Sequence, residues 1–186
     1  MSSSETSFAA PRRALLRWRN DRRGSAAIEF ALVAPMFFGL LFSIFEIGLV
    51  FFAGQVLENG LQQSARKMLT HQAADSSMTQ QQFVTDLCGR VSILMNCANL
   101  RVNVSVTAAG APITITTPID ANGKFVDSFN YQNPQPNTKE TVVVSAFYQW
   151  PLMVSQLGYS IANIDAGTAN GKYLLAAMAA FRVEPR

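Results

Sequence analysis

Residues 22–53 read RRGSAAIEFALVAPMFFGLLFSIFEIGLVFFA, and this stretch decides the fold. From Phe30 to Ala53 the only ionisable side chain is Glu46. These 24 residues would form a helix of roughly 36 Å, more than the roughly 30 Å of a bilayer's hydrocarbon. The sequence therefore predicts one membrane-spanning helix over residues 30–53.

Basic residues gather on one side of this apolar run. Six of the 15 Lys and Arg residues precede Gly24, against two of the 12 acidic residues. The positive-inside bias predicts a cytoplasmic leader, residues 1–24, with the rest of the chain beyond the membrane. Nucleic-acid binding is disfavoured, because the leader's topological role explains the basic character and no basic stripe follows. The six leader residues are Arg12, Arg13, Arg17, Arg19, Arg22 and Arg23.

Two other interpretations of the apolar run remain open. A secretory signal peptide has an apolar core of only about 7 to 15 residues and a small-x-small cleavage site. This run is longer, and Phe51-Phe52-Ala53 makes a poor site. A permanently uncleaved anchor accounts for the arginines and the length, but it does not require Glu29 directly ahead of the run.

The residues around Gly24 resemble the N-terminal segment of TadE-like minor pseudopilins of bacterial tight-adherence (Tad) pili, within the type IV pilin superfamily. In the processing motif of that family a glycine precedes the scissile bond, and a glutamate followed by an aromatic residue stands five positions later. The similarity continues through EFALVAP at 29–35 and FEIG at 45–48, whereas Leu49 replaces an arginine common in relatives. The residues that match the processing motif are Gly24, Ser25, Glu29 and Phe30.

The resemblance implies a non-enzymatic function in pilus assembly, adhesion or biofilm formation, without a cofactor. The expected partners are a prepilin peptidase, other pilin and minor pilin subunits, the inner-membrane Tad assembly platform and the membrane itself. The expected location is the bacterial inner membrane, with one span, a cytoplasmic N-terminus and a periplasmic C-terminal domain that enters the extracellular pilus after processing. The alternative is an uncleaved single-pass envelope protein whose periplasmic domain binds a partner.

Glu29 acquires a physical role if the bond after Gly24 is cut. Cleavage frees an α-amino group on Ser25, four residues before Glu29 and thus on the same helical face. A carboxylate in apolar surroundings favours a cationic partner, which this terminus or that of a neighbouring subunit could supply. The resemblance implies that Glu29 guides the subunit onto a growing fibre. An interfacial glutamate that contacts headgroups and water is the alternative.

Four further residues of the apolar run favour helix packing. Glu46 lies about 7 Å from the centre of the predicted span, where an acidic side chain costs roughly 2.5 to 3.5 kcal/mol, so it should face protein in the assembled state. Gly39 and Ser43 provide small-xxx-small spacing, and Pro35 removes one backbone donor and can kink the helix. The last three features also occur in ordinary membrane helices.

Beyond the span the pattern predicts a pilin-like α+β fold. The first helix should run over residues 25–70, and residues 71–186 should form one periplasmic domain with a small antiparallel sheet. A capping box at Thr79 and Gln82 starts a short amphipathic helix near Gln80. The expected strands are 102–107, 113–116, 141–150 and 173–183, with a turn at 122–123 and a loop at 133–137. Pattern alone leaves 173–183 ambiguous, and its similarity to TadE-like C-termini, including Glu184-Pro185, favours a strand.

Cys88 and Cys97 lie in the part placed outside the cytoplasm, where disulfides persist, so one bridge is expected. On an unbroken helix they would stand about 13 Å apart, beyond the roughly 7 Å limit for a disulfide. The helix should therefore end before Cys97, near Met95-Asn96. Two buried free thiols are the alternative.

The sequence offers little for catalysis or metal binding. His71 is the only histidine, and no Ser/His/Asp, Cys/His or metal-spaced cluster surrounds it. Asp120 and Asp127 could form a carboxylate pair, although acidic residues beside a turn are usually solvated. No metal site and no enzymatic activity are expected.

Overall fold

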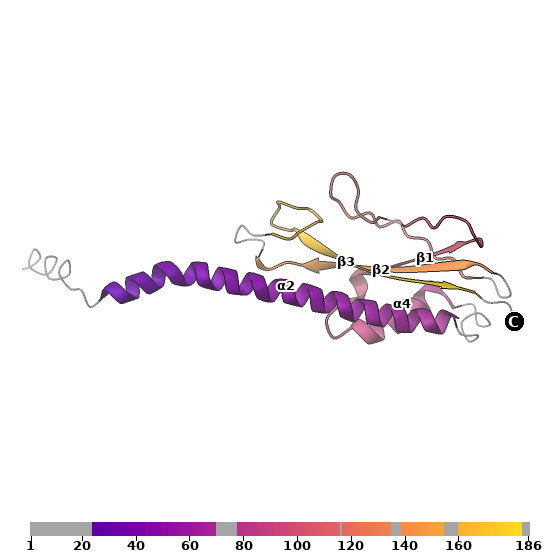
Figure 1. Ribbon diagram of the computed structural model, residues 1–186, viewed down its shortest axis with the longest axis horizontal. Helices are drawn as coiled ribbons and strands as arrows, with labels where there is room; N and C mark the ends of the chain where they lie inside the picture. Colours follow the sequence, from indigo (N-terminus) through magenta and orange to yellow (C-terminus); the bar gives the residue numbers. More distant parts are fainter. Residues whose placement is uncertain (1–23, 70–77, 116, 135–138, 155–159, 184–186) are drawn as a thin grey trace, which may run out of the picture. The chain divides into compact units, whose positions relative to one another are not determined.

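The structure, a computed structural model, describes residues 24–69, 78–115, 117–134, 139–154 and 160–183. The expectations for the leader, His71 and Glu184-Pro185 lie outside the described residues. The chain divides into two units, 1–41 and 42–186. The elements are α2 (Ser25–Leu69), α4 (Gln80–Val91), the 3-10 helix η2 (Cys97–Asn99), β1 (Leu100–Thr107), β2 (Thr141–Pro151) and β3 (Lys172–Arg182) (Figure 1). This is the predicted pilin-like α+β fold.

Helix α2 changes character along its 45 residues. Up to Leu49 no described residue of the helix is buried, and large apolar side chains are exposed at consecutive positions. From Val50 onward one face is buried at helical spacing, which makes this part of α2 a core element of the second unit. The buried apolar residues of that face are Val50, Ala53, Leu57, Leu61, Ala65 and Met68.

The capping box at the start of α4 is confirmed. The Thr79 hydroxyl accepts the Gln82 N–H at 3.3 Å, and the Gln82 side chain accepts the Thr79 N–H at 2.9 Å. The helix ends at Val91, four residues earlier than expected, and a turn follows it. The early end carries Met95 into the core and lets the chain return toward α4.

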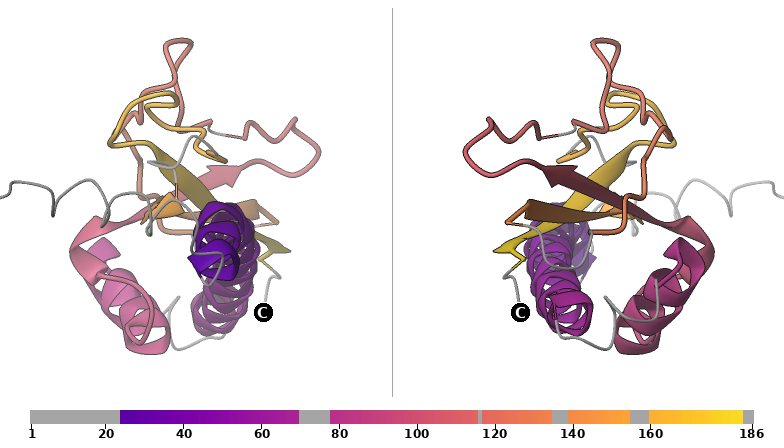
Figure 2. Two further views of the ribbon diagram at one scale, coloured as in Figure 1. Left: turned by 90° about the vertical axis from the view of Figure 1, so that its left-hand side faces the viewer. Right: turned by 90° about the vertical axis from the view of Figure 1, so that its right-hand side faces the viewer.

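The three strands form one antiparallel sheet in the order β1-β2-β3. Ala146 at its centre pairs with Val102 on one side and with Ala177 on the other. The expected strand over 173–183 is thus confirmed as β3. Figure 1 and Figure 2 show α4 and the C-terminal part of α2 on one face of the sheet, with the long loops on the other.

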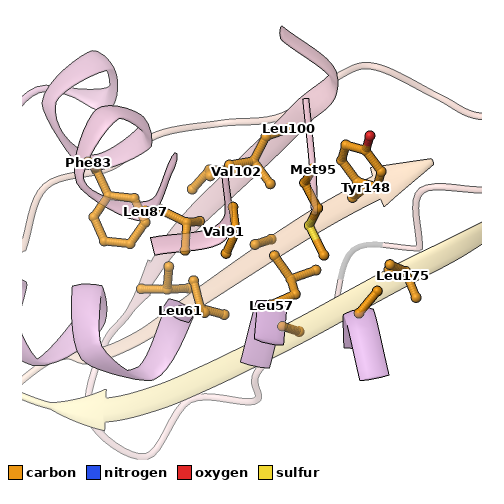
Figure 3. Packing of buried hydrophobic residues seen from close by; sticks show 14 of the residues in the cluster. Leu57, Leu61, Phe83, Leu87, Val91, Met95, Leu100, Val102, Tyr148 and Leu175 are labelled. Carbon is orange, nitrogen blue, oxygen red and sulfur yellow. The ribbon is translucent and has the colours of Figure 1, made fainter. Parts of the chain in front are cut away.

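Strand alternation sends β2 side chains into two separate layers. Val144 and Tyr148 belong to the main core, together with residues of α2, α4, β1 and β3 (Figure 3). On the opposite face Phe147 is buried and stacks on Phe129 with 5.2 Å between ring centroids. The central strand is therefore covered on both sides, which explains its nearly continuous burial.

The strand predicted at 113–116 is wrong for its described residues. Ile113 and Ile115 are 47% and 58% exposed, and residues 112–115 have no strand pairing. The outer edge of β1 is occupied instead by residues 130–132, through Val104 N–H to Asn130 O at 2.8 Å and Gln132 N–H to Val104 O at 3.0 Å. An alternating pattern forms a strand only where an edge is free to pair with it.

The turn at Asn122-Gly123 is confirmed. Gly123 adopts φ +73°, a left-handed conformation that glycine adopts without strain. Ile119 pairs with Phe125 across the turn. The Asp120 carboxylate accepts the N–H groups of Asn122 and Lys124 at 2.9 and 2.8 Å, which holds the turn closed.

Candidate functional site on the N-terminal helix

The residues that match the family's processing motif lie close together at the start of α2. Gly24 precedes the helix in a 3-10 turn, and α2 begins at Ser25. The Ser25 hydroxyl donates to the Glu29 carboxylate at 2.9 Å. Both side chains thus lie on one face of the helix, as the four-residue spacing predicts. Phe30 follows with its ring exposed.

In this arrangement Glu29 would gain an ion-pair partner if the chain were cut after Gly24. In the uncut chain residue 25 has a peptide N–H and offers Glu29 only a hydroxyl. A cut after Gly24 would turn that N–H into an ammonium group at the positive end of the helix dipole. The first turn of α2 contains no acidic side chain, so Glu29 would be the nearest carboxylate along the helix.

The surface that follows Glu29 is apolar on all sides of the helix. Among the described residues, α2 is the one helix long and apolar enough to cross a membrane, judged by length and composition. The helix continues through Pro35. At Gly39 an added Cβ would meet no atom of the described chain within 4 Å. The space beside Gly39 is therefore open to a neighbouring helix, and Ser43 lies one turn later on the same face.

Glu46 has a partner in its own chain. Its carboxylate accepts the backbone N–H groups of Met153 and Val154, the latter at 3.1 Å. These residues follow the end of β2 and are separated from Glu46 by more than 100 positions in the sequence. The carboxylate satisfies donors of an irregular turn that would otherwise need water or another acceptor. An acidic side chain in the apolar run is thereby used to attach the turn to α2.

A polar cluster between α2 and α4 has no signal in the sequence. Asp86 accepts from Ser64 at 2.8 Å, from Arg90 at 3.2 Å and from Lys67. Burial raises the pKa of the Asp86 carboxyl, but the hydrogen bonds from Lys67, Ser64 and Arg90 outweigh burial and lower the pKa below its ordinary 3.8. The cluster joins the two helices at the edge of the core.

Gly60 is a second position that sequence reasoning missed. A Cβ built there would lie 3.0 Å from Val91 Cγ1 and 3.3 Å from Leu87 Cδ1. The absence of a side chain therefore lets α4 approach α2 closely. The sequence contained one clue, because Gly60 lies on the same face as Leu57 and Ser64 within an otherwise regular helical pattern.

Cys88 of α4 and Cys97 of η2 are joined by a disulfide, with 5.6 Å between their Cα atoms. The bridge spans the turn after α4 and attaches that helix to the start of β1. Its loop contains Met95, which is buried in the core. The bridge thus stabilises the course of the chain between the helix layer and the sheet.

The residues considered for catalysis have structural partners. Asp120 closes its turn, and Asp127 forms an ion pair with Arg101 at 2.8 Å. Hydrogen bonds from the Lys124 and Asn122 backbone lower the pKa of Asp120, although burial opposes them. Within the described ranges no group of three or more His, Cys, Asp or Glu side chains could hold a metal ion.

A long apolar N-terminal helix followed by a short helix and a small antiparallel sheet defines a pilin-like fold. The model of the family described as TadE-like protein matches residues 24–66, which confirms the resemblance over that segment and associates the chain with the Tad pilus. The match covers nearly all of α2 and none of the sheet. No curated protein and no solved structure matches the chain.

Proposed function

We propose that this chain is a minor pilin, or pseudopilin, of a Tad pilus. In this proposal α2 anchors the protein in the bacterial inner membrane, with the leader in the cytoplasm and residues 71–186 in the periplasm. A prepilin peptidase removes residues 1–24, and the mature subunit packs its N-terminal helix among other pilin subunits on the assembly platform. In this proposal the protein acts by assembly, without catalysis and without a cofactor.

The observation that supports this proposal most strongly is the hydrogen bond between Ser25 and Glu29 directly after Gly24. A plain membrane anchor needs neither a glutamate at this depth nor a partner for it one turn earlier. The exposed apolar surface from Ile28 to Leu49 adds a second argument, because a fibre core can cover it with neighbouring helices once lipid is removed.

The N-terminus of the membrane-bound protein tests the proposal directly. Intact mass and N-terminal sequencing should show a chain that starts at Ser25 in cells with the peptidase and at the leader in cells without it. Full-length chains in purified pili would contradict the proposal. The alternative function, a permanently anchored envelope protein that binds a periplasmic partner, predicts the same uncut mass in both strains.

A further inference from the structure

The end of the sheet nearest Glu46 bears residues typical of a membrane surface. Pro151, the last residue of β2, pairs with Lys172, the first of β3. The next cross-strand pair is Trp150 with Tyr173. Trp and Tyr are enriched where proteins meet lipid headgroups, and the flexible lysine stem can extend its charge toward phosphate. Trp150 and Tyr173 are partly buried against the core. Lys172 lies on the other face of the sheet and donates to Gln149 at 3.1 Å.

An apolar side chain extends this end of the sheet. Met153 is 82% exposed, whereas Leu152 and Val154 on either side of it are buried. The bonds from Met153 and Val154 to Glu46 attach the turn to α2 at a defined level of the helix. A single exposed methionine is ordinary on a protein surface. This one adjoins the helix surface that is apolar on all sides.

The turn also limits how far the bilayer can extend along α2. Lipid-exposed irregular backbone does not occur in the hydrocarbon layer, because its N–H and C=O groups would lack partners. Glu46 accepts the N–H groups of residues 153 and 154, but the turn at 152–154 is irregular and Met153 is exposed, which argues for a hydrocarbon boundary at the level of Glu46. Residues 26–45 then supply about 30 Å of helix, which equals the thickness of the hydrocarbon layer. Residues 46–53 are therefore not needed to span it.

We propose that the membrane span is residues 26–45 and that one end of the outer domain, residues 71–186, rests on the outer leaflet of the phospholipid bilayer. This end is formed by Trp150, Met153, Lys172 and Tyr173. Met153 enters the boundary between headgroups and acyl chains, and Lys172 faces anionic headgroups. The inference rests on the proposed function only in that α2 is a membrane anchor.

The shifted span explains two further features. Phe51 and Phe52 are exposed, and they lie about 9 to 11 Å along the helix from Phe45, in the headgroup layer rather than in hydrocarbon. At the other end Glu29 lies about 5 Å inside the hydrocarbon. A charge at that depth needs a partner more strongly than an interfacial one does.

Spin labels on the full chain in nanodiscs of phosphatidylcholine and phosphatidylglycerol test the inference. Three single variants provide the comparison: Leu40→Cys in the span, Met153→Cys at the proposed contact, and Ala109→Cys in the turn after β1. Ala109 is the matched control, because β1 and β2 place it at the opposite end of the sheet from Met153. The native cysteines are bonded to each other and do not react.

Collision rates with oxygen, which enters lipid, and with a water-soluble nickel chelate measure the depth of each label. We expect the oxygen-to-nickel ratio at 153 to lie severalfold above that at 109 and to approach that at 40. An oxygen-to-nickel ratio at residue 153 equal to that at residue 109 overturns the inference. If the label at residue 40 then still gives a lipid-like ratio, the anchor remains supported. A water-like ratio at 40 rejects the anchor itself, and the inference with it.

Fluorescence of Trp150 gives an independent measure. Trp18→Phe leaves Trp150 as the sole tryptophan, and its emission should shift to the red when Met153→Asp is added, because the charge lifts this end of the sheet from lipid. Ala109→Asp should leave the emission unchanged. Equal emission from the Met153→Asp protein and its parent would contradict the proposed contact.

Discussion

At the scale of single residues, Glu29 is a carboxylate whose expected cationic partner arises only by cleavage. Glu29→Gln keeps the shape and removes the charge. Removal of one member of a buried ion pair costs about 3 to 5 kcal/mol, so the variant should insert in the membrane yet be strongly depleted from sheared pili. Immunoblots of membrane and pilus fractions measure both outcomes.

Glu58→Gln is the matched control for Glu29. Glu58 lies on the same helix beyond the apolar run, and its carboxylate accepts from Gln62 at 3.0 Å. This exposed contact should contribute little, and the control should assemble normally. Normal piliation by the Glu29→Gln protein would reject the pairing role and favour an interfacial glutamate.

Gly60 and Gly89 should respond in opposite directions to an added side chain. Gly60→Leu places bulk against Val91 and Leu87, and overpacking of this kind costs about 1 to 3 kcal/mol. At Gly89 an added Cβ meets nothing within 4 Å, so Gly89→Ala should stabilise α4 by up to about 1 kcal/mol. Thermal unfolding in detergent measures both shifts. A Gly60→Leu protein as stable as its parent would argue against the close helix contact.

At the scale of elements, the disulfide attaches α4 to the start of the sheet. Its loss should lower the stability of the outer domain by roughly 2.5 to 3 kcal/mol in the chain-entropy model, because the unfolded chain gains freedom. Helix α2 should remain formed, since its backbone bonds are internal to it. Denaturant unfolding of the Cys88→Ser/Cys97→Ser protein, with circular dichroism for helix content, checks both statements. Two thiols that alkylate without reduction would show that the bridge is absent.

Attachment of α4 to α2 should weaken in acid. The pKa of Asp86 is lower in the folded protein than its ordinary 3.8, so the unfolded chain takes up the proton first as the pH falls. The stabilisation by Asp86 is therefore complete above about pH 3.8. It is lost as the pH falls through the lower pKa that Asp86 has in the folded protein. Asp86→Asn should flatten the fall in melting temperature below pH 4. An unchanged pH profile in this variant would assign the acid sensitivity to other carboxylates.

At the scale of the whole molecule, the proposed membrane insertion and the proposed maturation make separate demands on the chain. Gly24→Leu alters the proposed cleavage site but leaves the apolar helix and its flanking arginines in place. The variant should insert with the same topology, retain the leader and fail to enter pili. Protease protection of the outer domain measures insertion, and intact mass measures processing. Efficient cleavage of the Gly24→Leu protein would place the processed bond elsewhere.

The sequence alone determined the parts of this protein that depend on neighbouring residues. The apolar run and its spacing indicated α2, the Thr79–Gln82 pair marked the start of α4, and alternation located β2. Hydrogen bonding within a turn, helical periodicity and strand alternation all act over a few positions, so they are visible in a single sequence. The TadE-like resemblance that begins at Gly24 belongs to the same group.

Only the tertiary structure decided which distant residues meet. It brought Glu46 to the turn after β2, set Gly60 against Val91, and paired Asp86 with Lys67. It also covered the edge of β1 with residues 130–132, which left the alternating residues at 113–115 without a strand to pair with. These outcomes depend on the close packing of elements far apart in the chain, and no local pattern encodes such contacts.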